Sequence, residues 1–412
     1  MRRKLINPNV KLAYLFTILQ SFGHGIWMGN ILSLYIVLFS EQAKGIFGLT
    51  SNELLGITSG ISGIAMIMVV FPAGILTDRY PRDLILRLAT LLGLIALGFL
   101  AVSQSIYLIM FSLFLWGAFE GLSRPAFESI VADSLPTGNR SRTYSRLHLA
   151  QQAAMASGPF LNVFLFLFLG DKWDILILHK VLLIGIAFSM ISTFLLLFFR
   201  DRHTMGEESE SVAFGPDLPQ AVSRRYRRIP YLLIASNVII GMGAGMTVKF
   251  FPVFFRSIYQ LQPISVQLIM GVTLFLTGLS GILAQQLSRH RGRVQMIFFF
   301  QLSAIICLVG ISFYPALLLL IPLFILRGSL MNASYPLSRS ILMDTVPKRQ
   351  RGKWNALDTF AWGLFWNASA AIGGFLIGEN NFQRCFLITA GIYLIGTIPV
   401  IMLLPLVEKE IN

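Results

Sequence analysis

The chain has 412 residues, of which 55% are hydrophobic and only 13% are charged. A water-soluble domain has no interior large enough for so many long apolar runs, so the composition excludes a soluble globule and indicates a multi-pass membrane protein. The only two cysteines, Cys307 and Cys385, lie in apolar runs and supply neither a disulfide framework nor a set of metal ligands.

Hydropathy predicts an all-α membrane protein with twelve transmembrane helices of about 20 to 27 residues each. The first span is longer than the apolar core of a signal peptide and lacks a small-residue cleavage site, so we expect it to remain as a helix. The predicted spans are residues 12–38, 53–77, 84–103, 106–133, 147–169, 178–199, 231–255, 265–287, 294–313, 316–343, 355–377 and 384–405.

The distribution of lysine and arginine predicts that both termini are cytoplasmic. With that orientation, 24 of the 33 basic residues fall in the tails and inner loops, five fall in outer loops and four fall within spans. The formal net charge of +14 is spread over every inner loop, a pattern that excludes one nucleic-acid-binding patch. We expect these residues to contact lipid headgroups of a plasma or inner membrane rather than an organelle.

The longest polar segment inside the chain divides it into two halves. We interpret residues 201–229 as a cytoplasmic linker between six-helix bundles at 1–200 and 230–412. A shift of 211 residues aligns 115–140 with 326–351 without a gap, with nine identities in 26 positions, and the same shift pairs 73–82 with 284–293. The matching spans would cross the membrane in the same direction, so the halves are predicted to be parallel repeats around a central cleft.

The first predicted inner loop carries a motif, AGILTDRYPR at 73–82. It resembles the signature of the major facilitator superfamily, a Gly, then Asp-Arg, then Gly-Arg. The matching residues are Gly74, Asp78, Arg79 and Arg82, whereas Pro81 stands where a Gly is usual and Asp83 where a basic residue is usual. The helix count, the linker and the repeat extend the resemblance over nearly the whole chain.

The resemblance implies the twelve-helix fold of that superfamily, with helices one, four, seven and ten around the solute pathway. It also implies that the loop motif belongs to an inner gate, with Asp78 bridging to the start of helix eleven. The alternative is a tight turn whose charges only enforce topology.

Two marks of the drug:proton antiporter branch of the family are incomplete. Leu113 occupies the position where that branch usually has an Arg in helix four. Helix five reads SGPFLNV and keeps only Gly158 and Pro159 of a Gly-Pro-x-x-Gly-Gly run. The likeness to this branch is therefore distant, and proton-driven efflux of hydrophobic compounds is an alternative function.

Six formally charged residues lie inside the predicted spans. A charged side chain that faces lipid at the bilayer centre costs about 2.5 to 3.5 kcal/mol. Six such costs exceed the net stability of a typical fold, so we expect these side chains to face protein or a water-filled path. They are Glu120, Arg124, Glu128, Lys249, Arg327 and Arg339.

Three of these charges form one stripe on helix four, because Glu120, Arg124 and Glu128 follow one another at four-residue spacing. Glu120 is the candidate proton-coupling residue, since a buried carboxylate titrates near neutral pH when desolvation outweighs attraction. The alternative is a pair of Glu120 with Arg124 that only stiffens the bundle. Glu128 is equivalent to Arg339 in the repeat, and these two residues either pair between the halves or form local salt bridges.

The candidate substrate-binding residues come from predicted helices one, four, seven, ten and eleven. Four cations against two anions inside the spans favour an amphipathic organic anion as the substrate. The alternatives are simple packing of the histidine and the aromatic side chains, and outward snorkelling of Lys249. The candidates are Arg124, Arg327, Lys249, His24, Gln20, Tyr335, Trp362 and Trp366.

The candidate gating residues lie near the inner ends of the spans. Asp133 and Asp344 each precede a proline by three residues, and we expect them to act at the inner gate or to cap a helix. The complete set is Gly74, Asp78, Arg79, Arg82, Glu128, Asp133, Arg339, Asp344 and Asp358.

The sequence contains no Gly-rich phosphate loop, no metal-spaced His or Cys cluster and no nucleophile with its base, so we expect neither enzyme activity nor a cofactor or metal. The hypothesis is a monomeric secondary transporter, symporter or antiporter, that moves a small organic solute by rocker-switch alternating access, with protons as a candidate coupling ion. A membrane receptor or scaffold without transport is the alternative from another class.

Overall fold

The computed structural model describes residues 7–42, 48–135, 140–204, 228–346 and 351–407, and the long regular elements in these ranges are all helices. Eleven stretches of the described residues are long and apolar enough to cross a membrane, and α13 (Arg351–Ile377) adds a shorter apolar stretch, Phe365–Ile377. The predicted all-α membrane fold is thereby confirmed.

The chain forms two compact units. The first consists of Met1–Leu49 and Ile57–Gly215. Its helices are α1 (Pro8–Trp27), α2 (Asn30–Gln42), most of α3 (Ser51–Arg79), α4 (Arg82–Ala101), α5 (Ile106–Asp133), α6 (Arg140–Leu169) and α7 (Ile175–Leu195), followed by the 3₁₀ turns η2 (Leu196–Phe198) and η3 (Asp201–His203).

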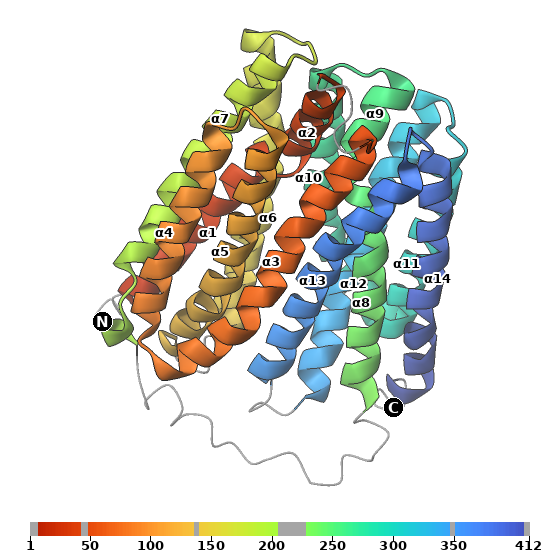
Figure 1. Ribbon diagram of the computed structural model, residues 1–412. Coiled ribbons are helices and arrows are strands. Elements are labelled where there is room, and N and C mark those ends of the chain that lie inside the picture. Colours follow the sequence, from red (N-terminus) through yellow and green to blue (C-terminus); the bar gives the residue numbers. More distant parts are fainter. Residues whose placement is uncertain (1–6, 43–47, 136–139, 205–227, 347–350, 408–412) are drawn as a thin grey trace. The chain divides into compact units, whose positions relative to one another are not determined.

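The second unit consists of Thr50–Gly56 and Pro216–Asn412. Its elements are α8 (Ile229–Thr247), η6 (Val248–Phe250), α9 (Phe251–Tyr259), α10 (Pro263–Arg291), α11 (Arg293–Ser312), α12 (Leu317–Thr345), α13 and α14 (Phe382–Val407), coloured from green to blue in Figure 1. The predicted boundaries of the two halves stay a prediction, and most of the predicted linker 201–229 lies outside the described residues.

The 211-residue repeat recurs in the helix boundaries of the two units. The starts of α4, α5 and α6, at Arg82, Ile106 and Arg140, each precede by 211 residues the starts of α11, α12 and α13. Helices of matching length and position therefore follow from the duplicated sequence.

The repeat also recurs in side-chain packing. In the first unit, a Cβ built at Gly117 of α5 overlaps the carbonyl oxygen of Ser62 in α3. In the second unit, a Cβ built at Gly328 of α12 lies 2.9 Å from Cγ2 of Thr273 in α10. Both pairs differ by the same 211 residues, so each unit uses a glycine to bring equivalent helices into close contact.

Two of the predicted spans are interrupted. The first breaks at Met28 and Gly29, between α1 and α2. The seventh passes from α8 through the 3₁₀ turn η6 into α9, where Pro252 stands in the first turn. Proline has no N–H to continue the hydrogen-bond ladder, which explains the second break. This break lies beside Lys249, one of the candidate binding residues.

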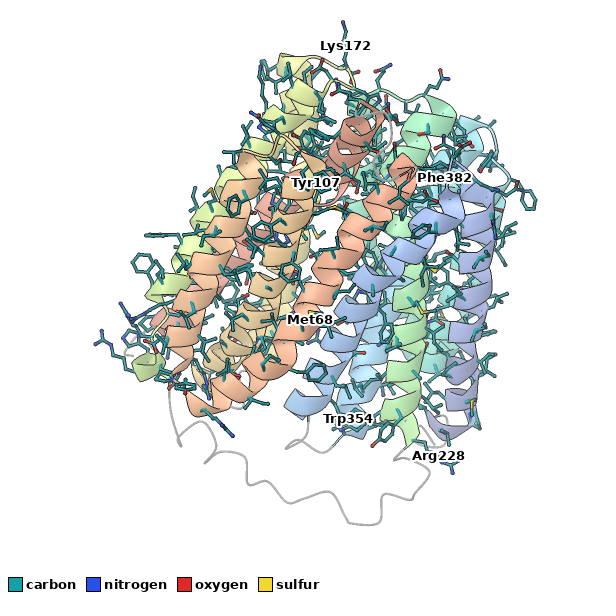
Figure 2. All side chains as sticks on the ribbon, viewed as in Figure 1. Met68, Tyr107, Lys172, Arg228, Trp354 and Phe382 are labelled. Atoms are coloured by element: carbon teal, nitrogen blue, oxygen red, sulfur yellow. The ribbon has the colours of Figure 1, made fainter. Side chains whose placement is uncertain are left out.

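Apolar side chains fill the interior of each unit and also cover the outward-facing surfaces of its helices. In the first unit, Trp27, Trp116 and Phe119 are fully buried. Met68 and Tyr107 are among many exposed apolar side chains (Figure 2), as expected for surfaces that contact lipid acyl chains.

Candidate functional site

The candidates predicted on helices seven and eleven meet along one seam between α8 and α13 in the second unit. Both helices begin at the same end of the unit, where Arg228 and Trp354 lie (Figure 2) and where the rings of Tyr231 and Trp354 pack with centroids 4.9 Å apart. The two helices are therefore parallel, and residues 121 positions apart face each other along the seam.

Two glycines of α8 hold α13 close. A Cβ built at Gly241 lies 3.1 Å from Cε3 of Trp362, and a Cβ built at Gly245 overlaps the backbone oxygen of Trp366. The Trp362 and Trp366 rings stack with centroids 5.8 Å apart and an interplanar angle of 29°. Both tryptophans are only half-buried, so the seam presents an aromatic surface between its two polar ends.

Lys249 occupies one polar end of this seam. Its Nζ donates a hydrogen bond of 2.7 Å to Oδ1 of Asn367, and the side chain is half-buried. Lys249 therefore turns toward α13 of its own unit, which argues against the snorkelling alternative. A lysine ammonium in a low-dielectric surround is a strong point of attraction for an anion.

Asp358 occupies the other polar end. Its side chain is buried, with 2% of the residue surface exposed, and its Oδ1 accepts a hydrogen bond of 2.7 Å from Nδ2 of Asn237 on α8. Lys249, Trp362, Trp366 and Asp358, all named from the sequence, thus share one seam.

Arg327 is buried in the interior of the second unit. Only 5% of it is exposed, its Nη2 donates a 3.0 Å hydrogen bond to the Tyr393 hydroxyl on α14, and its Cζ lies 5.0 Å from the Phe251 ring centroid on α9. The guanidinium therefore ties α9, α12 and α14 together. Its predicted contact with substrate stays a prediction.

The remaining cation of α12 is half-buried. Nη1 of Arg339 donates a hydrogen bond of 3.4 Å to the hydroxyl of Tyr335, one turn away on the same helix. The structure thus brings together two residues that the sequence analysis had assigned to different roles.

The first unit carries a polar chain on α1 and α7. Ser192 donates to Oε1 of Gln20, and Nε2 of Gln20 lies 2.9 Å from Nε2 of His24. The His24 ring also packs edge to face against Trp27 and Trp116, with centroids 5.9 and 5.6 Å away. This geometry favours the packing interpretation of His24, because two tryptophans flank its imidazole.

The charged stripe on α5 contains a local ion pair. Nε of Arg124 lies 3.6 Å from Oε1 of Glu128, and the two side chains are 45% and 41% exposed. This contact supports the local-salt-bridge alternative for Glu128. Glu120 is half-buried one turn before Arg124.

Two equivalent ion pairs lie at the ends of the helices that carry the gating candidates. Asp133 pairs with Arg82 in the first unit, and Asp344 pairs with Arg293 in the second, where Nη1 and Oδ2 are 2.5 Å apart. Each pair joins neighbouring helices of one unit. Arg293 is a partner that the sequence analysis did not name, although the repeat makes it the equivalent of Arg82.

The structure describes some of the side chains of the predicted inner-loop motif at 73–82. Gly74 lies within α3, where no heavy atom of a described neighbour comes within 4 Å of a built Cβ, and Arg79 is exposed. The predicted bridge from Asp78 falls on a side chain outside the described ones. Its role in a gate stays a prediction.

The neutral partners of the candidate residues were not predicted from the sequence: Asn237 for Asp358, Asn367 for Lys249, Ser192 for Gln20 and Tyr393 for Arg327. The two asparagines could have been found from the sequence, because each is an isolated amide within an apolar span. Among the described residues, no group of three or more His, Cys, Asp and Glu side chains lies together as a metal site would require.

Several solved structures of membrane transporters are similar to this chain. A bacterial homologue of the iron transporter ferroportin, in its inward-facing state, gives a TM-score of 0.70 at 14% identity and covers 96% of this chain and 98% of its own. The nucleoside transporter NupG gives 0.69 at 13% identity, with 96% and 98% covered. The human organic anion transporter MFSD10 gives 0.62 at 15% identity, with 95% and 99% covered.

At such identities these likenesses show the fold alone. No curated protein matches the sequence. The model of the Major Facilitator Superfamily matches residues 12–331 and 313–411, which together include nearly every residue. This chain therefore belongs to the major facilitator superfamily, and it is a multi-pass membrane transporter rather than an enzyme.

Proposed function

We propose that this chain is a secondary transporter that moves a small amphipathic organic anion by alternating access of its two halves. Membership of the superfamily supports transport, and the absence of a phosphate-binding loop from the sequence argues against direct use of ATP. The substrate class rests on the seam between α8 and α13.

The observation that carries the proposal is the placement of Lys249 next to the stacked tryptophans. Its ammonium is half-buried and hydrogen-bonded to the neutral amide of Asn367, while Trp362 and Trp366 offer apolar ring faces on the same helix as Asn367. A carboxylate or phosphate would bind the ammonium, and an apolar or aromatic body would pack on the rings.

The name of one structural relative agrees with this class. MFSD10 is described as an organic anion transporter, although its 15% identity leaves the substrate of this chain to be measured. In the proposed site, a cationic substrate would be repelled by the positive charge of Lys249.

We further propose that a proton gradient drives the transport through Glu120 and that the protein acts as a monomer with both termini in the cytoplasm. Glu120 is half-buried on α5, near the Arg124–Glu128 pair. Partial removal of a carboxyl group from water favours its neutral, protonated form, so a carboxyl at this position is suited to carry a proton.

The test is ligand binding followed by flux. Thermal unfolding of the purified protein would be measured with organic anions, with their neutral esters and amides, and with lipophilic cations of similar size. We expect the anions to raise the unfolding temperature most. Proteoliposomes would then report uptake of the best anion with and without a pH gradient.

Other outcomes separate the alternatives. Stabilisation by lipophilic cations with pH-driven flux would support efflux of hydrophobic drugs and contradict the anion proposal. Saturable binding with no flux in either direction would support a receptor or scaffold.

A further inference from the structure

The second unit buries one carboxylate among helices predicted to span the membrane. Among the described residues, Asp358 and Arg327 are the only charged side chains in the buried class. The other carboxylates with a described ion pair have more exposed side chains, with 21% for Asp83, 33% for Asp133, 41% for Glu128 and 55% for Asp344. Asp358 therefore stands apart from every other described acid by its burial.

The partners of Asp358 compensate only part of the cost of a buried negative charge. Asn237 donates one hydrogen bond of 2.7 Å, and an amide carries no net charge. A carboxylate removed from water without a closely paired cation is expensive, whereas a neutral carboxyl in the same place needs only its hydrogen bonds. The site therefore suits a carboxyl group that gains and loses a proton.

Among the described residues, the charged group that interacts with Asp358 is Arg339 on α12. Arg339 is half-buried and hydrogen-bonds Tyr335 on its own helix. On α8 the facing group is Asn237, and the cation of that span, Lys249, lies twelve residues further on, about 18 Å along a helix. On α14 the charged residue Arg384 stands at the opposite end of the unit, near Phe382 (Figure 2), and Lys353 on α13 falls outside the described side chains.

We propose that Asp358 is a proton-binding site of the second unit. In the protonated state the neutral carboxyl keeps the Asn237 hydrogen bond and leaves Arg339 with Tyr335. In the deprotonated state the carboxylate attracts the Arg339 guanidinium, which stays protonated throughout. One proton leaves Asp358 for water, and no other bond is made or broken.

The proton site has a consequence for the seam. Asp358 and Trp362 are one turn apart on α13, so a change in the pairing of Asp358 acts on the helix that carries the stacked tryptophans and Asn367. Use of this proton in transport rests on the proposed function, whereas binding of the proton does not.

The test uses protons as the probe and requires no substrate. Infrared difference spectra of the purified full-length protein would be recorded between about pH 4 and pH 9 for wild type, Asp358→Asn, Asn237→Ala and the control Asp344→Asn. We expect the C=O band of a protonated carboxyl in wild type and in Asp344→Asn, and its loss in Asp358→Asn. Asn237→Ala should keep the band but shift its frequency, because the hydrogen bond to the carboxyl is lost.

Asparagine is nearly isosteric with aspartate, and thermal unfolding would verify that each variant is folded. A band that persists in Asp358→Asn, or no pH-dependent band in wild type, would overturn the proposal. An unchanged band frequency in Asn237→Ala would also count against it. Flux is scored separately: loss of the band in Asp358→Asn together with no flux in wild type would refute transport and leave the proton site standing.

Discussion

Arg293 at the start of α11 and Asp344 near the end of α12 form an ion pair, with Nη1 and Oδ2 2.5 Å apart. The same guanidinium donates a 2.7 Å hydrogen bond to Ser340. At the positions 211 residues earlier in the chain, Arg82 pairs with Asp133. Each unit therefore joins an equivalent pair of helices, α4 with α5 and α11 with α12, by an ion pair between equivalent residues.

The two ion pairs should contribute modestly and equally to stability. A double-mutant cycle of Arg293→Gln and Asp344→Asn should give a coupling energy of about 0.2 to 1 kcal/mol, because both groups are partly exposed. The cycle for Arg82→Gln and Asp133→Asn should give a similar value. Unfolding in detergent measures both, and a coupling of about zero in one unit only would contradict structural equivalence.

Replacing a glycine at a helix contact by alanine should lower the free energy of unfolding. The loss should be larger where the added methyl group meets backbone atoms than where it meets a side chain that can move. Gly117→Ala should destabilise most, by about 1 to 3 kcal/mol, because the added Cβ meets the Ser62 backbone. Gly328→Ala should cost less, since the Thr273 side chain can move.

The matched control for the glycine series is Gly98→Ala in α4, where no heavy atom of a described neighbour lies within 4 Å of the built Cβ. This variant should be neutral or slightly stabilising because alanine favours helix. Thermal unfolding ranks the three variants, and equal effects at Gly98 and Gly117 would refute the close packing of α3 and α5.

Lys249 should select for negative charge. Lys249→Gln should weaken binding of an organic anion by about tenfold or more, since a hydrogen bond to a charged group is lost, and should change binding of its neutral ester little. Lys172→Gln is the control, because Lys172 is exposed at one end of the first unit (Figure 2). The affinities of both ligands would be measured by thermal shift or calorimetry. If Lys249→Gln weakened binding of the anion and of the ester equally, Lys249 would have a structural role instead.

Arg327 should act mainly on stability. Tyr393→Phe removes its hydrogen-bond acceptor and should lower the free energy of unfolding by about 1 to 3 kcal/mol, and Arg327→Ala should cost more because it also removes the packing on Phe251. Chemical or thermal unfolding measures both. A selective loss of anion binding in a stable Arg327→Ala protein would instead support direct contact with substrate.

Glu120 should be required for accumulation but not for exchange. Glu120→Gln should abolish uptake driven by a pH gradient in proteoliposomes and spare counterflow of labelled solute, because a glutamine cannot carry the proton. Normal accumulation in this variant, with loss of accumulation in Asp358→Asn, would move the coupling role to Asp358.

Several properties of the fold followed from the pattern of residues. The twelve spans were visible because lipid requires about 20 apolar residues per helix, and the repeat was visible because Gly117, Pro125, Asp133 and their equivalents recur at one offset. The break at η6 is consistent with Pro252, which cannot continue the hydrogen-bond ladder, whereas the break at Gly29 was less predictable because glycine is tolerated within many transmembrane helices.

The sequence predicted which charged residues belong to the candidate site, but it did not predict their hydrogen-bond partners. Charges within apolar spans are costly, so Lys249, Arg327 and Asp358 were conspicuous in the sequence. Their partners Asn367, Tyr393 and Asn237 come from helices 66 to 121 residues away, and no local spacing relates them.

The sequence by itself determined that this is a membrane protein built from two related halves, because apolar length and a fixed offset are properties of the chain alone. Only the tertiary structure decided that Arg327 is buried and hydrogen-bonded to Tyr393, that Arg124 pairs with Glu128, and that Asp358 is buried beside Asn237. The reason is physical: burial and pairing depend on which helices meet and in what register, and these contacts arise between segments far apart in the chain.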